Sequence, residues 1–391
     1  MRQAPRVLII ADDLTGAMDS AGPFACLGVE TWVVAEPMRC DPAGLTTARV
    51  VSINTGTRHL PGAQAATRVA DIARQVGAGG FDIVVKKIDS TLRGNVVAET
   101  LALREASARS EVVVAAAFPA QGRTVQGGMV YVDGKPLAQT GFAHDALSPP
   151  PLVPLQQVFA AARSGLRVAL ATPLDAFGTG AEVWIADSQT DADLERIVQT
   201  LAPRLDAVLM VGSAGLTRAL ARICFSGHPA ARDWKPLAGT LVFAVGSRAQ
   251  RSAEQVLALA AQPDTRVLPA PNGRLTNTEL PRAQNLVIQA TTGESGRDGD
   301  AARVAADIAQ QAIQMVQRTQ AQALIATGGD TAIAILAASG NPALQVLGDL
   351  MPGIPYARIQ IGGIPVWLIT KAGGFGGHET FRDLARKLRE G

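Results

Sequence analysis

The chain has 391 residues, of which 47% are hydrophobic and 18% are charged, and its formal net charge is only +2. This length predicts two domains, and the weak net charge argues against nucleic acid as a partner. Three scattered cysteines form neither a disulfide framework nor a CxxC metal site, which fits a reducing compartment. The N-terminal apolar run is too short for a signal peptide and no stretch is long enough to span a membrane, so we expect a cytoplasmic protein.

The N-terminal half alternates short β-branched apolar runs with Ala-rich segments of helical period. We predict strands at 7–11, 31–35, 50–54, 83–87 and 112–117, and helices at 63–76 and 96–108. The alternation resumes with strands at 167–171, 182–186 and 207–211 and a helix at 215–224. Between these two series, residues 121–155 predict a hairpin that turns at Asp133-Gly134, followed by an extended proline segment. This order is typical of a parallel sheet covered on both faces.

Residues 226–239 are the best candidate for a domain boundary, since they hold two prolines and two glycines without apolar periodicity. A second series of strands follows at 241–245, 286–289, 323–326 and 366–370. We therefore predict an α/β protein with domains at 1–232 and 238–391. Each domain has a mainly parallel sheet flanked by helices, and the active site is expected in the cleft between them.

Paired carboxylates, Asp12 and Asp13, follow the first strand in IIADDLTGAMDSA. Ligands of open α/β sheets bind outside the carboxyl ends of the strands, so one of these groups could accept a proton from a hydroxyl or hold a metal ion. The alternative is that Asp13 caps the next helix and that Asp12 is solvated.

Two more strands end in polar segments. The fourth strand ends as VVKKIDSTLRGN, which brings together basic, acidic and amide or hydroxyl groups at Lys86, Lys87, Asp89, Ser90, Arg93 and Asn95. SINTGTRH contributes Asn54, Thr55, Thr57 and Arg58, and a later loop adds Gln121, Arg123 and Thr124. Such a cluster suits the carboxylate or phosphate of a small anion, although a solvated strand end is the alternative. His144 and Asp145 look like half a catalytic pair, but GxSxG is missing and a structural role is favoured.

The second domain has three junctions where a strand runs through glycines into a helix: FAVGSRAQRSAEQV, LIATGGDTAIAIL and LITKAGGFGGHETF. Free N–H groups at a helix N-terminus are the physical basis of phosphate binding, so the three junctions predict a nucleotide site. Neither GxxxxGK[ST] nor a GxGxxG after the first strand is present, which makes a P-loop or nicotinamide site the weaker interpretation. Ser247, Thr327 and Thr331 could add hydroxyls, Lys371 a positive charge and Asp330 a metal link.

These motifs together resemble the four-carbon acid sugar kinases, long catalogued as a domain of unknown function. The resemblance rests on ADDLTGAMD, KKIDSTLRGN, FPAQGRTVQGGMVYVDG, GSRA, TGGDTA and MPGIPYARI…KAGGFGG, in this order along nearly the whole chain. It implies an N-terminal domain for the sugar acid, a C-terminal domain for ATP, and phosphorylation of the terminal hydroxyl of D-threonate, D-erythronate or a 3-oxo-tetronate. D-threonate is the favoured substrate, and Mg²⁺ is expected, with its ligands unassigned.

The predicted site residues fall into three groups. The catalytic candidates are Asp12 and Asp89. The acid is expected to contact Asp12, Asp13, Arg58, Lys86, Lys87, Ile88, Asp89, Ser90 and Arg93. The nucleotide is expected to contact Gly246, Ser247, Thr327, Gly328, Gly329, Asp330, Thr331, Lys371, Gly373, Gly374 and Gly376.

In the predicted mechanism, Arg58 and Lys87 hold the substrate carboxylate and Asp12 orients or deprotonates the hydroxyl, with Asp89 or Asp13 as alternatives. Phosphoryl transfer depends on positioning and charge stabilisation, so no covalent nucleophile is needed. Two other functions stay open: an NAD-dependent hydroxy-acid oxidoreductase and a non-catalytic nucleotide-binding protein. The oligomeric state is also open, a homo-oligomer included.

Overall fold

A computed structural model describes residues 4–40, 45, 48–145, 148–171, 177–178, 180–228, 234–276, 283–292 and 300–390. The chain divides into two units, Met1–Pro229 and Ala230–Gly391. Part of the predicted boundary stretch, residues 229–233, lies outside the described residues. The two units are described separately below.

The N-terminal unit is built on a parallel sheet. Its eight described strands lie in the order β2-β3-β1-β4-β11-β5-β10-β9. Their bounds are β1 Val7–Ala11, β2 Thr31–Val34, β3 Val50–Asn54, β4 Ile83–Lys87, β5 Glu111–Ala115, β9 Val168–Ala171, β10 Val183–Ala186 and β11 Val208–Gly212. The predicted strands are confirmed to within two residues. The central strands are buried along their whole length, because helices cover both faces of a parallel sheet.

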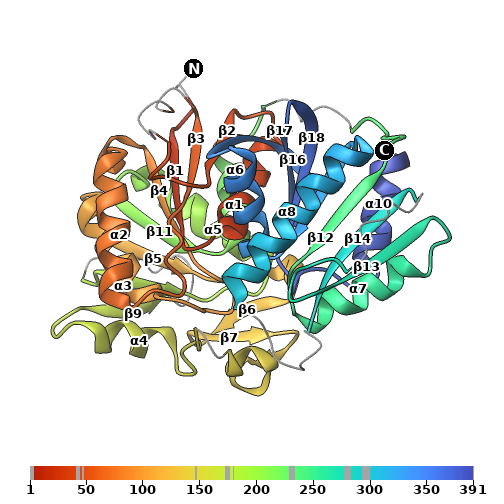
Figure 1. Cartoon of the computed structure of the whole chain (residues 1–391). Coiled ribbons are helices and arrows are strands. Elements are labelled where there is room, and N and C mark those ends of the chain that lie inside the picture. The colour runs from red at the N-terminus through yellow and green to blue at the C-terminus, as the bar shows by residue number, and fades with distance from the viewer. Residues whose placement is uncertain are drawn as a thin grey trace. The chain divides into compact units, whose positions relative to one another are not determined.

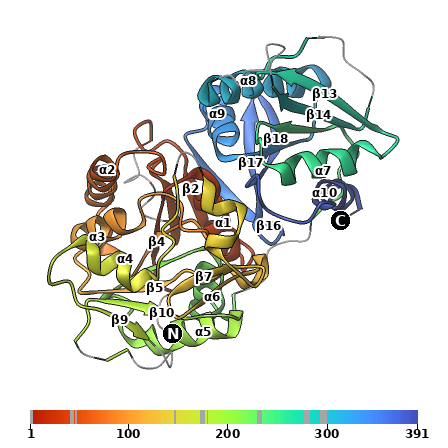
Figure 2. The same ribbon diagram turned by 90° about the horizontal axis from the view of Figure 1, so that it is seen from below.

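Helices α2 and α3 pack together on one face of this sheet with α4 beside α3, and α1, α5 and α6 lie on the other face (Figure 2). Their bounds are α1 Leu14–Ala25, α2 Gly62–Gln75, α3 Val96–Ala106, α4 Leu155–Ala162, α5 Asp191–Leu201 and α6 Ala214–Cys224. Every residue of α1 is buried, and Phe24 near its end packs edge-on against Phe225 with ring centroids 5.5 Å apart. The end of α1 is thereby fixed against the end of α6.

A small antiparallel sheet of the N-terminal unit contains the predicted hairpin. It consists of β6 Arg123–Gln126, β7 Met129–Val132 and β8 Lys135–Pro136, in the order β6-β7-β8. Asp133 and Gly134 both have positive φ, +49° and +76°, as a two-residue I′ turn requires, so the predicted turn is confirmed. The sequence did not predict β6, whose turn to β7 is held by the Asp187 carboxylate through the N–H groups of Gly127 and Gly128.

The C-terminal unit combines parallel and antiparallel strands in the order β13-β14-β12-β15-β18-β17-β16 (Figure 1). Their bounds are β12 Leu241–Val245, β13 Thr265–Pro271, β14 Asn285–Thr291, β15 Ala323–Thr327, β16 Ala343–Met351, β17 Ile354–Ile361 and β18 Ile364–Lys371. The first five in spatial order are parallel, and the last three pair antiparallel. A mainly parallel sheet in each unit confirms the predicted fold class, whereas β13 and the β16–β17 hairpin were not predicted.

The helices of the C-terminal unit also cover both faces of its sheet. α7 and α10 contact each other, as do α8 and α9. Their bounds are α7 Gln250–Ala260, α8 Ala301–Thr319, α9 Gly329–Ser339 and α10 Thr380–Glu390. Phe243 of β12 contacts Phe381 of α10 in the core between sheet and helices, with ring centroids 5.4 Å apart.

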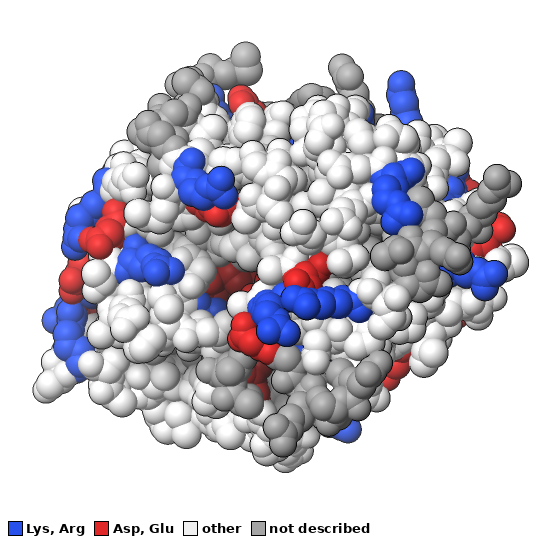
Figure 3. All heavy atoms as spheres, viewed as in Figure 1, with Lys and Arg blue, Asp and Glu red and all other residues white. Residues whose placement is uncertain are grey.

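Basic and acidic side chains are interspersed on the face drawn in Figure 3, and neither sign dominates a broad area of its described residues. Within the described parts of the chain, no helix combines the length and the apolar character needed to cross a bilayer.

Candidate active site

Three neighbouring strands of the N-terminal unit end at the same level. Ala11, the last residue of β1, pairs with Asn54 at the end of β3 and with Lys87 at the end of β4. The three polar segments predicted from the sequence therefore start side by side at the carboxyl edge of the sheet. Close packing of these segments follows from the register of the parallel strands.

Arg58 is the centre of the network at this edge. Its Nε and Nη2 donate to the two oxygens of Asp12 at 2.7 and 3.0 Å, and its Nη1 donates to Asp13 at 2.6 Å. A third carboxylate, Asp89, lies 3.8 Å from Nη2. Burial disfavours the charge of the guanidinium, but the three carboxylates outweigh this effect and raise the pKa of Arg58 well above its usual value. Arg58 stays charged and draws the three acids together.

The paired carboxylates have different surroundings. Asp13 caps α1 by accepting from the Gly16 N–H at 2.8 Å, and it also accepts from the Thr15 hydroxyl at 2.7 Å. Burial opposes its charge, but Arg58 and Lys87 outweigh that opposition and lower the pKa of Asp13. The predicted cap is confirmed, whereas Asp12 is buried against Arg58 and is not solvated.

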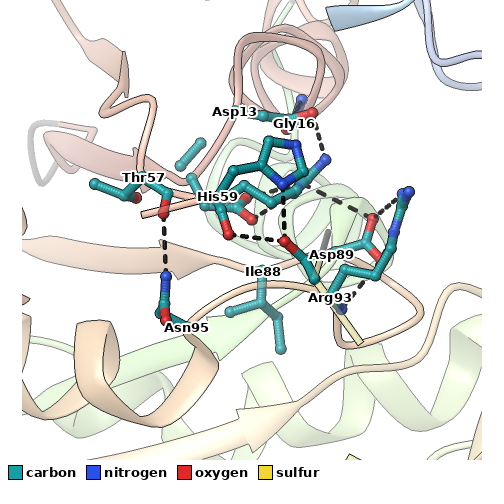
Figure 4. A network of polar contacts seen from close by, with 12 residues as sticks. Asp13, Gly16, Thr57, His59, Ile88, Asp89, Arg93 and Asn95 are labelled. Atoms are coloured by element: carbon teal, nitrogen blue, oxygen red, sulfur yellow. Dashed lines mark hydrogen bonds and ion pairs between the residues drawn. The ribbon is translucent and has the colours of Figure 1, made fainter. Parts of the chain in front are cut away.

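Asp89 organises the turn after β4. One carboxylate oxygen accepts from the Thr91 N–H at 3.1 Å and from the Thr91 hydroxyl, and Arg93 donates to both oxygens at 3.0 and 2.9 Å. Burial alone would raise the pKa of Asp89, but Arg93 and Arg58 hold it well below the usual value. Arg93 in turn reaches Asp145 at 3.5 Å. Asp89 is therefore a weak base that holds the turn together (Figure 4).

The two adjacent lysines at the end of β4 point in opposite directions, as strand geometry requires. Lys86 turns away from the network and forms a fully buried ion pair with Glu99 of α3, at 2.8 Å. Lys87 lies beside Gly16 at the start of α1, and its ammonium makes one hydrogen bond within the described residues, to the Ile88 carbonyl at 3.0 Å. Lys87 thus keeps two N–H donors for a ligand.

The loop after β3 is fixed on the end of β1. Thr57 and Arg58 donate their backbone N–H groups to the Asp12 carbonyl at 2.9 and 3.3 Å, and Asn95 binds the Thr57 carbonyl at 3.1 Å. His59 contacts the Ser148 hydroxyl at 2.8 Å. Figure 4 shows Thr57 and Asn95 bound to each other on one side of the network that contains Asp13, His59 and Asp89.

Gly94 lies directly against Asp12. Its φ is +89°, and a Cβ at this position would stand 3.2 Å from the nearer Asp12 oxygen. Glycine therefore keeps this side of the carboxylate uncovered.

Other predicted residues have different places. Ser90 and Ile88 are buried within the segment that follows β4. Arg123 lies over the Phe142 ring and binds the Gln121 carbonyl, and its charge also interacts with those of Asp89 and Arg93. His144 is exposed.

The second predicted site also lies at three level strand ends. In the C-terminal unit, Val245 of β12 pairs with Thr327 of β15, which pairs with Lys371 of β18. Each strand continues through glycines into α7, α9 or α10, so the three predicted junctions are confirmed as neighbours. The loops interlock: a Cβ on Gly246 would overlap the Thr331 hydroxyl, and one on Gly373 would overlap the Ser247 hydroxyl.

Residues that the sequence analysis missed hold the third of these loops. Ser252 of α7 donates to the Gly373 carbonyl at 2.9 Å. Gln255, three residues on, donates to the carbonyls of Phe375 and Gly377 at 2.9 and 2.8 Å. Their spacing places them on one helix face, but polar residues with this spacing are common on exposed helices, so the sequence carries no distinctive signal.

Comparison with known proteins gives matches to both units. A family model described as "Sugar-binding N-terminal domain" matches residues 7–220, and one described as "Nucleotide-binding C-terminal domain" matches residues 242–381. A D-threonate kinase of Cupriavidus necator is 36% identical, with 94% of each chain covered. One from Bordetella bronchiseptica is 32% identical, covering 99% of this chain and 98% of the relative. A 3-oxo-tetronate kinase of Methylobacterium radiotolerans is 30% identical, covering 95% and 96%.

Two solved structures are also similar. One from Salmonella typhimurium LT2, titled a putative tRNA synthase, has a TM-score of 0.77 at 24% identity and covers 98% of this chain and 99% of its own; it bears on the fold alone. One from Bordetella bronchiseptica, titled a domain of unknown function with bound citrate and a domain-swapped dimer, has a TM-score of 0.51 at 30% identity. It covers 99% of both chains.

The buried pair of Lys86 and Glu99 gives a first prediction. Replacing Lys86→Met should lower the free energy of unfolding by about 3–5 kcal/mol, because it strands a buried carboxylate that has no other hydrogen bond among the described residues. The double variant Lys86→Met/Glu99→Leu should recover most of this loss, since no charge is then left alone in the core. Urea unfolding followed by circular dichroism measures both changes.

Arg74→Met is the matched control, because Arg74 pairs with Asp71 at 3.0 Å on the surface. We expect its effect to stay within about 0.5 kcal/mol. Equal destabilisation of the single and double variants would contradict the assignment of Lys86 to the core.

Proposed function

Because the chain belongs to the four-carbon acid sugar kinase family, we propose that it transfers the terminal phosphoryl group of ATP to the 4-hydroxyl of D-threonate, giving D-threonate 4-phosphate. The relatives named for D-threonate support this substrate, at 36% and 32% identity over nearly the whole chain. 3-Oxo-tetronate and D-erythronate are the alternatives, because relatives named for them are 30% and 28% identical.

We assign the acid to residues 1–232 and the nucleotide to residues 238–391. The descriptions of the two matching family models support this division. The observation that carries the proposal is the cluster at the level ends of β3, β1 and β4, where the buried Lys87, with two open donors, is level with the residue that precedes the buried carboxylate of Asp12. Such a pair can hold a carboxylate at one point and a hydroxyl at another.

Lys87 is the main contact for the substrate carboxylate in this proposal. Its ammonium is buried and makes only one hydrogen bond among the described residues, so a carboxylate that binds there replaces no protein partner. Arg58 has five N–H donors, of which three are already used by Asp12 and Asp13, and it can add a second contact. Ser90 and Arg93, in the following turn, complete the proposed acid site.

Asp12 is the proposed catalytic carboxylate. Asp13 is occupied as a helix cap and Asp89 as the centre of a turn, and the pKa of each is lowered, which weakens both as bases. Each Asp12 oxygen accepts one bond from Arg58 and keeps a further lone pair for a substrate hydroxyl. In phosphoryl transfer such a group mainly orients the attacking oxygen and accepts its proton.

The glycine loops of the C-terminal unit fit a nucleotide. The neighbouring hydroxyls leave no room for a Cβ at Gly246 or Gly373, so only backbone atoms line the loops at these two positions. The N–H groups of Gly373, Gly374 and Gly376 make no hydrogen bonds among the described residues. Free N–H groups of this kind bind phosphate oxygens. ATP with Mg²⁺ is therefore the proposed cosubstrate. The remaining predicted contacts lie in the loop after β12 and at the junction of β15 with α9: Ser247, Thr327, Gly328, Gly329, Asp330 and Thr331.

Mg²⁺ would reach this site with the nucleotide. The described residues hold no cluster of three or more metal-ligating side chains. A nucleotide-bound Mg²⁺ keeps several waters and needs only one or two protein carboxylates, which Asp330 at the start of α9 could supply. The ion neutralises phosphate charge during transfer.

Replacing Asp12→Asn should lower kcat by about a hundredfold or more, because the amide cannot accept the hydroxyl proton. The affinity for ATP should stay within about twofold of the wild type, since Asp12 belongs to the N-terminal unit. Steady-state kinetics and calorimetric titration with ATP measure the two quantities. Asp71→Asn, an exposed position on α2, is the control, and a variant at Asp12 with normal turnover would remove this residue from catalysis.

A coupled ADP-release assay over D- and L-threonate, D- and L-erythronate and their 3-oxo forms tests the substrate. We expect the highest kcat/KM with D-threonate. A higher value with another acid would replace D-threonate by that acid. If no acid supports ADP release, the proposed reaction is wrong.

A further inference from the structure

Lys371 at the end of β18 is a buried cation without a carboxylate partner among the described residues. Its side chain is 1% exposed, and no ion pair within 4.0 Å includes it. The ammonium instead donates to three backbone carbonyls of the following loop: Ala372 at 2.8 Å, Phe375 at 3.1 Å and Gly373 at 3.3 Å. The Phe381 ring of α10 lies on another side, with its centroid 5.4 Å from Nζ.

The loop 372–377 has its carbonyls directed inward. Besides Lys371, Ser252 binds the Gly373 carbonyl, and Gln255 binds those of Phe375 and Gly377. The N–H groups of Gly373, Gly374 and Gly376, in contrast, make no hydrogen bonds within the described residues. Peptide units with bound carbonyls and free N–H groups present the positive ends of their dipoles to a ligand.

The number of donors on Lys371 decides how well this arrangement holds. A protonated ammonium has three N–H donors, which match the three carbonyls. A neutral amine has two donors and a lone pair, and the lone pair would face a carbonyl oxygen. Lys371 can therefore donate a hydrogen bond to all three loop carbonyls only when it is protonated.

We infer that Lys371 is a positioning residue that holds the phosphate-binding loop 372–377 from beneath, touches only the loop's carbonyls, and takes up a proton when the nucleotide binds. This inference rests on the proposed nucleotide site. It differs from a direct role, in which the ammonium would contact phosphate, because all three donors are already used by the loop.

The linkage has a definite sign. Burial, with a smaller contribution from Arg251, lowers the pKa of Lys371 from 10.5 to about 7. A bound polyanion favours the charged form and raises that pKa, so binding takes up a proton above pH 7 and weakens as the pH rises. Charged residues on the surrounding elements are Arg251 and Glu254 on α7, Asp330 on α9, and Glu379 and Arg382 at α10. Only Arg251 contributes to the shift.

Calorimetric titration of the full chain with ADP, in excess Mg²⁺ and at pH 7.5, tests the inference. Measured in two buffers of different ionisation enthalpy, the wild type should take up about half a proton or more per ADP beyond the value for Lys371→Met. That variant should bind ADP about tenfold more weakly or worse. Lys387→Met, an exposed lysine on α10, is the matched control and should behave as the wild type.

Hydrogen exchange separates positioning from direct contact. Without nucleotide, the Phe375 amide, which donates to the Ala372 carbonyl at 3.1 Å, should exchange faster in Lys371→Met than in the wild type, whereas a lysine that only contacts phosphate would leave that exchange unchanged. If Lys371→Met does not fold, the wild type alone decides: its Kd for Mg-ADP should rise about tenfold from pH 7 to pH 8.5.

The outcomes separate the two proposals. A wild type that binds ADP without extra proton uptake, or a variant with unchanged affinity and loop exchange, overturns the inference and leaves the nucleotide site standing. A wild type that binds neither ADP nor ATP overturns both.

Discussion

The register of neighbouring parallel strands is the constraint on which both candidate sites depend. In the N-terminal unit, Ala11 is level with Asn54 and Lys87, and in the C-terminal unit, Thr327 is level with Val245 and Lys371. Because the strands end together, three loops start together, and residues distant in the sequence become neighbours. The hydrogen-bond ladder thus determines which polar segments can meet before any side chain is considered.

Buried charge is handled differently in the two units. In the N-terminal unit, Arg58 and Lys86 form ion pairs with carboxylates, which offset their charges. Lys87 instead makes a single hydrogen bond among the described residues, and its other two N–H donors can bind a ligand. In the C-terminal unit, backbone carbonyls surround Lys371 instead. A cation paired with carboxylates contributes little net field to a ligand, whereas a lysine held by neutral carbonyls carries an uncancelled charge beneath the loop once it is protonated.

Much of the fold could be predicted from the sequence, because fully apolar runs with glycine at their ends indicate parallel strands and βα turns. The direction of each side chain could not. Both faces of β4 are buried, so no polar alternation shows that Lys86 faces Glu99 while Lys87 faces the start of α1. The division of roles between Asp12 and Asp13 likewise depends on where Arg58 lies, a contact across 46 residues.

The antiparallel part of the C-terminal sheet escaped prediction for a related reason. β16 and β17 contain Gly348 and Pro355, which usually interrupt strands, and their pairing includes register shifts that accommodate both. These shifts lie between β16 and β17, outside the strands β12, β15 and β18 that lead into the glycine loops. In the proposed function, side chains select the ligand in the N-terminal unit, whereas backbone N–H groups do so in the C-terminal unit. Substitutions of side chains in the N-terminal unit can therefore change the proposed acid site without altering the glycine loops of the C-terminal unit, where a Cβ on Gly246 or Gly373 would overlap a neighbouring hydroxyl.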